Sequence, residues 1–388
     1  MGRNSGRNCS VNKHTTDNHI GHPGLNVPWW SPEIEKITEM KKILIAFMAI
    51  AVLTSCNKDV DPAPTPTGAP ISFGNVATRA GLTEVERYGF NVWAAVSSKD
   101  EASTVQYEPL LENREVVLQD GEWNYGEPEN WISNSMFYFF AAYPQDTFHQ
   151  QRIQEGDYKF TIYSTDVTVN GTTDTEDILV ATNVTDTSEE GYATTVTLNF
   201  GHLLTKVNVK IRQNFDADPD FNYYITGVTI RKYKEQDTDP DNGAIYCDGT
   251  CIFLPYNNQF HNWWDFDKES PVLIKKEYST PMILRNVGAA DPTVNLSVWG
   301  DGLMLIPQEI ASNAVEIVVD YIYDVSVDDD YTNGTPKQAK GIIPAITWEA
   351  GKSINYSLAI SNTTIITFDQ PTIEPWGAPQ TGGTIIIK

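Results

Sequence analysis

The side chains most often used in catalysis are few in this sequence and widely spaced. After the apolar segment at residues 43–53, the only histidines are His149, His202 and His261. They have no H-x-x-x-H or H-E-x-x-H spacing, and His202 is expected to pack at the end of a strand. The sequence has no G-x-S-x-G turn, phosphate-binding glycine loop or dinucleotide fingerprint. Acidic residues are so abundant that a carboxylate pair cannot be recognised. We therefore predict no enzyme, no cofactor and no metal site.

One segment imitates the start of a calcium-binding loop. Residues 237–243 read DTDPDNG, with aspartates at alternating positions. The glycine falls one place late, and Asp248 stands where the closing bidentate glutamate belongs. The favoured interpretation is a solvent-exposed hairpin turn.

Cysteine is scarce. Cys247 and Cys251 form the pattern CDGTC, which predicts a small disulfide loop if the protein is in an oxidising compartment. A zinc site is disfavoured because no second pair of ligands is evident.

Cys56 stands at the end of an export signal. Residues 40–56 read MKKILIAFMAIAVLTSC, in which a basic pair precedes an apolar run. That run is much shorter than the roughly 20 residues needed to span a bilayer, and it ends in a pattern that resembles a bacterial lipobox. A short buried helix is the alternative. It is disfavoured because residues 57–70 are a polar, Pro-rich tether. We therefore predict lipidation at Cys56.

The residues ahead of this signal show no sustained period of 3.6 or 2. Residues 1–39 are therefore interpreted as a mis-assigned start region, with translation beginning at Met40. Residues 1–56 are excluded from the fold prediction.

The 332 residues that follow Cys56 are enough for two domains. The whole chain has a formal net charge of −24, with 51 acidic residues against 27 basic ones. Nucleic acid is therefore excluded as a partner, since phosphate binding needs a basic surface.

Strand-like alternation recurs along these residues. Four segments alternate apolar and polar residues with period 2, and they are rich in β-branched and aromatic side chains. They read TVTLNF at 195–200, KVNVKIR at 206–212, AVEIVVDYIY at 314–323 and INYSLAI at 354–360. No long amphipathic helix competes with them. The pattern predicts an all-β protein with two tandem antiparallel β-sandwiches.

A polar interruption near residues 185–192 suggests the domain boundary. The N-terminal domain is then predicted at residues 71–190 and the C-terminal domain at 191–388, after the tether at 57–70.

Aromatic residues gather in two places. Trp123, Tyr125 and Trp131 are close in the sequence, and Trp263 and Trp264 are adjacent. Exposed rings could stack on sugars. Packing in the core or in loops is the favoured interpretation, because aromatic residues dominate β-sandwich cores.

Several phrases in order along the chain resemble the fimbrillin-like family, the type V pilus subunits of Gram-negative anaerobes. They are ISFGNVATRA at 71–80, WNYGEPENW at 123–131, MFYFFAAYP at 136–144, EDILVAT at 176–182, LNFGHLLTKVNVKI at 198–211, LMLIPQ at 303–308, ITWEAGKSINYSLAI at 346–360 and PTIEPWGAPQTGGTIIIK at 371–388. The resemblance implies a lipoprotein precursor with two transthyretin-like domains, which polymerises by strand exchange.

The resemblance also assigns roles to residues at both ends of the mature chain. A trypsin-like protease would cut between Arg79 and Ala80 and release the strand that carries Ile71, Phe73 and Val76. A sandwich without that strand exposes an apolar groove and unpaired backbone, which is a template for another strand. The donor strand would carry Ile385, Ile386 and Ile387, after a flexible Gly-Gly pair. An ordinary surface arginine and a permanent edge strand are the alternatives.

The resemblance leaves the role of the subunit open among shaft, tip and anchor. The expected location is the surface of the outer membrane and the fimbrium, and the expected partners are other fimbrial subunits and host or bacterial glycans or proteins. The competing hypothesis is a non-polymerising surface lipoprotein that binds glycans through exposed tryptophans.

Overall fold

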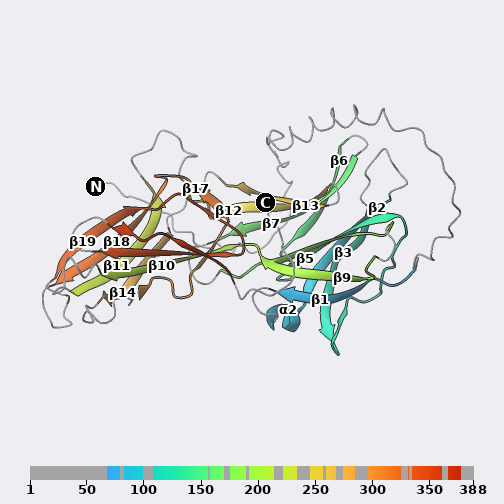
Figure 1. Ribbon diagram of the computed structural model, residues 1–388, viewed down its shortest axis with the longest axis horizontal. Coiled ribbons are helices and arrows are strands. Elements are labelled where there is room, and N and C mark those ends of the chain that lie inside the picture. The colour runs from blue at the N-terminus through green and yellow to red at the C-terminus, as the bar shows by residue number, and fades with distance from the viewer. Residues whose placement is uncertain are drawn as a thin grey trace, which may run out of the picture. The chain divides into compact units, whose positions relative to one another are not determined.

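The described residues of the computed structural model form almost entirely β-strands, with one short helix among them, α2 (Thr83–Tyr88) (Figure 1). This confirms the predicted all-β class. The structure describes residues 68–78, 83–98, 108–155, 158–169, 175–188, 192–213, 222–233, 245–256, 259–267, 274–284, 296–324, 331, 334–360 and 366–376. No helix within these ranges is long and apolar enough to cross a membrane.

The largest sheet has seven strands, and its first strand along the chain lies at one edge. Their order across the sheet is β1 (Ser72–Thr78), β9 (Thr195–His202), β8 (Leu179–Asp186), β5 (Ser135–Tyr143), β2 (Phe90–Ser98), β3 (Glu108–Gln119) and β4 (Glu122–Asn124). In Figure 1, β1 is drawn in blue beside β9, with α2 nearby.

Four further sheets complete the described part of the chain. Two have four strands each: β13 (Gln259–Phe266), β12 (Asp248–Tyr256), β7 (Tyr158–Thr168) and β6 (His149–Glu155); and β14 (Ile274–Leu284), β11 (Asn222–Lys232), β18 (Val315–Asp324) and β19 (Thr335–Ile342). A six-stranded sheet runs β15 (Leu296–Ser297), β10 (Thr205–Gln213), β21 (Lys352–Ile360) and β22 (Thr367–Phe368), with β16 (Leu303–Leu305) on β10 and β23 (Thr372–Pro375) on β21. The smallest pairs β17 (Gln308–Ile310) with β20 (Ile346–Trp348).

Every residue of β5 is buried, and the strand contributes to two large apolar clusters. One face of this strand presents Phe137 and Phe139 to a cluster that also contains residues of β1, β9 and α2. The opposite face presents Phe140, whose ring stacks on Tyr163 of β7 with centroids 4.8 Å apart. Because β5 is covered on both sides, its sequence shows no apolar–polar alternation.

The four alternating segments all form strands with the expected faces buried. In β9, for example, Val196, Leu198 and Phe200 are buried while the residues between them are half-buried. The prediction of antiparallel pairing holds for most pairs but not for all. β1 pairs with β9 in parallel, and β10 pairs with β21 in parallel. Apolar–polar alternation shows on which face of the sheet a side chain lies, but it does not show whether neighbouring strands are parallel or antiparallel.

The predicted boundary at residues 190/191 stays a prediction. Strand pairing crosses this position three times: β9 pairs with β8 and with β1, and β7 pairs with β12 over Asp248–Phe253.

The disulfide expected between Cys247 and Cys251 is absent: both residues are buried, and neither forms a disulfide. They flank an extended segment that pairs with β7, so their Cα atoms lie roughly 13 Å apart at about 3.3 Å per residue. A disulfide needs Cα atoms within about 7 Å. Burial also raises the pKa of the Cys251 thiol. Both side chains face the core instead.

Candidate functional site at the first strand

β1 is held in the sheet by a single neighbour. Its register with β9 places Ser72 opposite Thr195 and Thr78 opposite Phe200, with a shift between Gly74 and Ala77. The other edge of β1 has no strand partner among the described residues. A strand paired on one side only can leave a sheet without breaking any other pair.

The first residues of this region nevertheless reach the core. Ile71 is 2% exposed and Phe73 is 5% exposed. The Phe73 ring makes edge-to-face contacts with three other aromatic rings, at centroid distances of 5.1, 6.1 and 6.4 Å to Tyr125, Phe139 and Phe90. Such contacts add to the free energy gained by removing the ring from water.

A glycine permits the close approach of β1 to β9. A Cβ atom on Gly74 would lie 2.5 Å from a methyl group of Thr195. Real side chains do not come this close, so a larger residue at position 74 would force either the Thr195 side chain or β1 to shift.

The chain just before β1 is fixed by the loop at residues 129–131. The Ile71 N–H donates to the Glu129 carbonyl at 2.8 Å, and the Trp131 N–H donates to the Ala69 carbonyl at 3.0 Å. The Tyr125 hydroxyl donates to the Ile71 carbonyl at 2.7 Å. A tyrosine hydroxyl keeps its proton at neutral pH, and burial raises the pKa of Tyr125 further, so the hydroxyl remains a donor. The sequence did not indicate this role for Tyr125.

The other residues predicted for this region lie wholly or partly outside the described residues. Val76 lies within β1, but its side chain is outside the described residues, as are Arg79 and Ala80. Arg79 follows directly on Thr78, the last residue of β1. Also outside the described residues lie Cys56, residues 237–243 and the isoleucines at 385–387. Their roles stay predictions.

The first aromatic group serves the core, as the favoured interpretation held. Trp131 is 1% exposed and its indole N–H donates to the Thr194 carbonyl at 3.0 Å. Trp123 is half-buried against the same cluster as Phe73. Trp263 differs, because it is 40% exposed on β13 while its neighbour Trp264 packs against the core.

The three histidines are not gathered into one site. His202 ends β9, is 2% exposed, and approaches Asp177 with 2.7 Å between its Nδ1 and the Oδ2 atom. This confirms its expected packing at a strand end. His149 is exposed on β6, and His261 on β13 contacts Gln259. Among the described residues, no group of three or more His, Cys, Asp or Glu side chains is placed to hold a metal ion.

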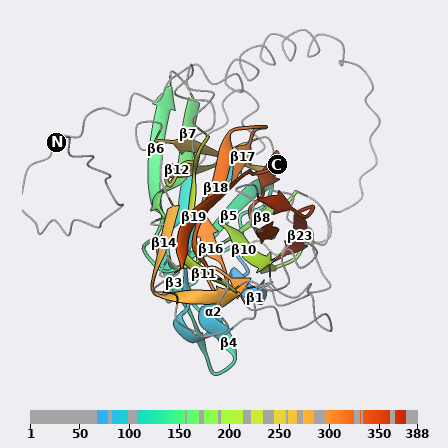
Figure 2. The ribbon, with the colours of Figure 1, turned by 90° about the vertical axis from the view of Figure 1, so that its left-hand side faces the viewer.

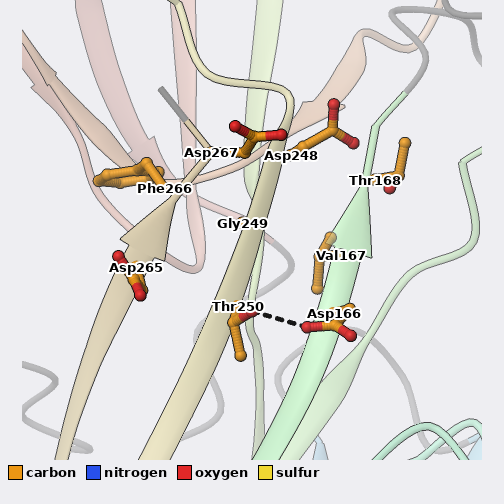
Figure 3. Close-up of a pocket in the computed structure, with 9 residues that line it drawn as sticks. All are labelled: Asp166, Val167, Thr168, Asp248, Gly249, Thr250, Asp265, Phe266 and Asp267. Carbon is orange, nitrogen blue, oxygen red and sulfur yellow. Dashed lines mark hydrogen bonds between the residues drawn. The ribbon is translucent and has the colours of Figure 1, made fainter. Parts of the chain in front are cut away.

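A shallow hollow of about 300 Å³ lies across the ends of β7, β12 and β13 (Figure 3). Its lining includes four aspartates: Asp166, Asp248, Asp265 and Asp267. Thr250 donates to Asp166 at 2.6 Å, as the dashed line in Figure 3 marks. None of the nine described residues that line the hollow is basic. Its negative charge opposes the binding of phosphate-bearing ligands.

Comparison with protein families gives two matches. The family described as fimbrillin-like matches residues 78–376. The prokaryotic membrane lipoprotein lipid attachment site matches residues 40–57, which include Cys56. No curated protein matches the sequence.

Solved structures also resemble the chain. A fimbrial protein from Bacteroides vulgatus ATCC 8482 shares the fold, with 17% identity and a TM-score of 0.54 over 79% of this chain and 99% of its own. Two others match with lower scores. A putative cell adhesion protein from Bacteroides ovatus ATCC 8483 has 14% identity and a TM-score of 0.41, over 81% and 99% of the two chains. The tip fimbrial protein Mfa3 from Porphyromonas gingivalis has 10% identity and a TM-score of 0.31, over 78% and 98%.

Proposed function

This chain belongs to the fimbrillin-like family, and from that premise we propose that it is a fimbrial subunit assembled by donor-strand exchange. The family consists of fimbrial and adhesin-like subunits and not of enzymes. Together with the lipid attachment site, this makes the protein a membrane-anchored surface lipoprotein. The finer proposal is that Cys56 carries the lipid at the outer membrane, and that a cut after Arg79 starts assembly.

The observation that carries the proposal is the position of β1. It is an edge strand of the described sheet, Phe73 within it and Ile71 just before it are buried, and Arg79 follows its last residue. A cut there would separate this strand from the rest of the domain. Loss of the strand would expose the Phe73 site and one side of the β9 backbone. Such a surface is unfavourable in water and accepts a strand from another chain.

The proposed donor matches the geometry of the site that it would fill. Ile71 and Phe73 are two positions apart and enter the same cluster. Ile385 and Ile387 are also two positions apart, so an extended backbone would direct both to the same side. Ile386 would face away. The donor therefore offers large apolar side chains at the required spacing.

The experiment is a controlled cut of purified protein that begins at residue 57. Digestion with an Arg-specific protease under native conditions is expected to yield chains that start at Ala80 and oligomers that grow with time. Arg79→Ala is the control and is expected to stay monomeric. Size-exclusion chromatography and intact mass follow both. Oligomers of equal size from Arg79→Ala, or a stable monomer that starts at Ala80 and has lost residues 57–79, would count against the proposal.

A second candidate function is supported by the exposure of Trp263. An indole that is 40% exposed on an edge strand could stack on the apolar face of a sugar. In that case the uncut lipoprotein would bind a glycan as a monomer, and Trp263→Ala would weaken binding at least tenfold on a glycan array or by calorimetry. The control is Ile132→Ala, which changes an exposed apolar residue elsewhere and is expected to leave binding unchanged. Trp131→Phe is unsuitable as a control because Trp131 is buried.

A further inference from the structure

The last segment of the described chain is attached at two points. The first is at residues 366–369. Ile366 is 5% exposed and its N–H donates to the Lys340 carbonyl at 2.9 Å, while Asp369 pairs with Arg212 at 3.0 Å. Phe368 packs beside Tyr356 in the same region, with ring centroids 6.5 Å apart. This first attachment is therefore built into the core.

β23 (dark red in Figure 2) follows, and its side chains contribute little to its attachment. Among the described strands it pairs with β21 alone, over Thr372–Pro375. All four of its side chains are exposed, and Ile373 is 50% exposed. Ordering the backbone of β23 costs conformational entropy, and none of its four side chains is buried to offset this cost.

Trp376 supplies the second attachment. Its indole lies flat on the His202 imidazole, with ring centroids 3.9 Å apart and planes 4° apart. Lys206 Nζ lies 5.6 Å from the indole centroid, and the backbone N–H of Trp376 donates to the Gly351 carbonyl at 2.9 Å. His202 is itself oriented by Asp177. The partners of Trp376 thus come from β9, from β10 and from the turn before β21.

We propose that Trp376 is a clamp that fixes the starting point of the C-terminal tail on the subunit. The tail is the twelve residues that follow Trp376, and it includes the proposed donor strand. With Trp376 seated, these residues reach at most about 40 Å. Released to Asp369, nineteen residues would reach about 65 Å. The clamp therefore sets the length and the flexibility of the joint between successive subunits. This role rests on the proposed function.

The clamp also lies close to the strand that the assembly would use. His202 is two residues beyond Phe200, the last residue of β9 that pairs with β1. The tail therefore leaves the subunit at the end of the same strand whose edge β1 covers. β9 therefore carries both the backbone edge that would accept a donor strand and His202, on which Trp376 is stacked.

The test uses purified protein that begins at residue 57 and measures amide hydrogen exchange. Trp376→Ala is expected to speed exchange in residues 371–376 at least tenfold and to leave β10 unchanged. Trp376→Phe keeps a ring on His202 and is expected to stay within about threefold of the wild type. Trp263→Ala is the matched control, since it removes an exposed indole from β13. Unchanged exchange in residues 371–376 of Trp376→Ala would overturn the clamp.

The second readout concerns the joint and uses protein cut at Arg79. Fibres of Trp376→Ala are expected to bend more strongly and to vary more in subunit spacing in electron micrographs than wild-type fibres. Fibres with wild-type bending, despite faster exchange in β23, would overturn the role in the joint. If wild-type protein forms no fibres, the proposed function fails. The hydrogen-exchange measurement still tests whether Trp376 holds residues 371–376 on the subunit.

Discussion

Replacing Phe73 with alanine is expected to lower the free energy of unfolding by about 3–5 kcal/mol. The ring is 5% exposed and is surrounded by the rings of Tyr125, Phe139 and Phe90. Its removal loses the transfer free energy of the ring and leaves a cavity, because β5 and β2 behind it are central strands that cannot move in. Urea unfolding of protein that begins at residue 57 measures the effect.

Ser72→Ala is the matched control for Phe73→Ala. Ser72 lies next to Phe73 on the same strand, is exposed, and has its hydroxyl 3.0 Å from that of Thr195. Its replacement is expected to cost less than about 1 kcal/mol. A loss of less than 1 kcal/mol for Phe73→Ala itself would show that β1 is only loosely attached. The groove left by β1 would then have little affinity for a donor.

The second large effect concerns the donor strand. Changing both Ile385 and Ile387 to aspartate is expected to abolish chain growth after the Arg79 cut, because two charges would be forced into an apolar groove. Ile386→Asp is the matched control. It is expected to reduce growth only weakly, since period-2 geometry directs this side chain out of the groove.

Chain growth in these variants is measured by size-exclusion chromatography of cut protein. Equal loss of growth from Ile386→Asp and from the double variant would contradict strand insertion and indicate a different contact. Undiminished growth of the double variant would remove the C-terminal strand from the mechanism.

Much of the fold could be predicted from local pattern. Alternation located β9, β10, β18 and β21 and gave the buried face of each, because one side of these strands meets the core. The parallel pairing of β10 with β21 could not be predicted. These strands are separated by more than 130 residues, and alternation is the same in either direction. β5 could not be recognised by period, since it is buried on both faces.

The role of the first strand stays a prediction, and the contacts that hold it could not be predicted from the sequence. The resemblance to fimbrillins singled out Ile71 and Phe73, and the structure places both in the core. The hydrogen bond from the Tyr125 hydroxyl to the Ile71 carbonyl could not be predicted from local sequence, because the two residues are 54 positions apart. The same is true of Trp376 and His202. Gly74 did carry a signal: a glycine inside a strand indicates close approach of another backbone or side chain.

The measurement that tests the assembly mechanism most directly is the intact mass of the protein recovered from the cell surface. Cleavage after Arg79 predicts a chain that begins at Ala80 and carries no lipid. A chain that begins at lipidated Cys56 would contradict the mechanism, because β1 would still be joined to its domain and the site beside β9 would remain filled.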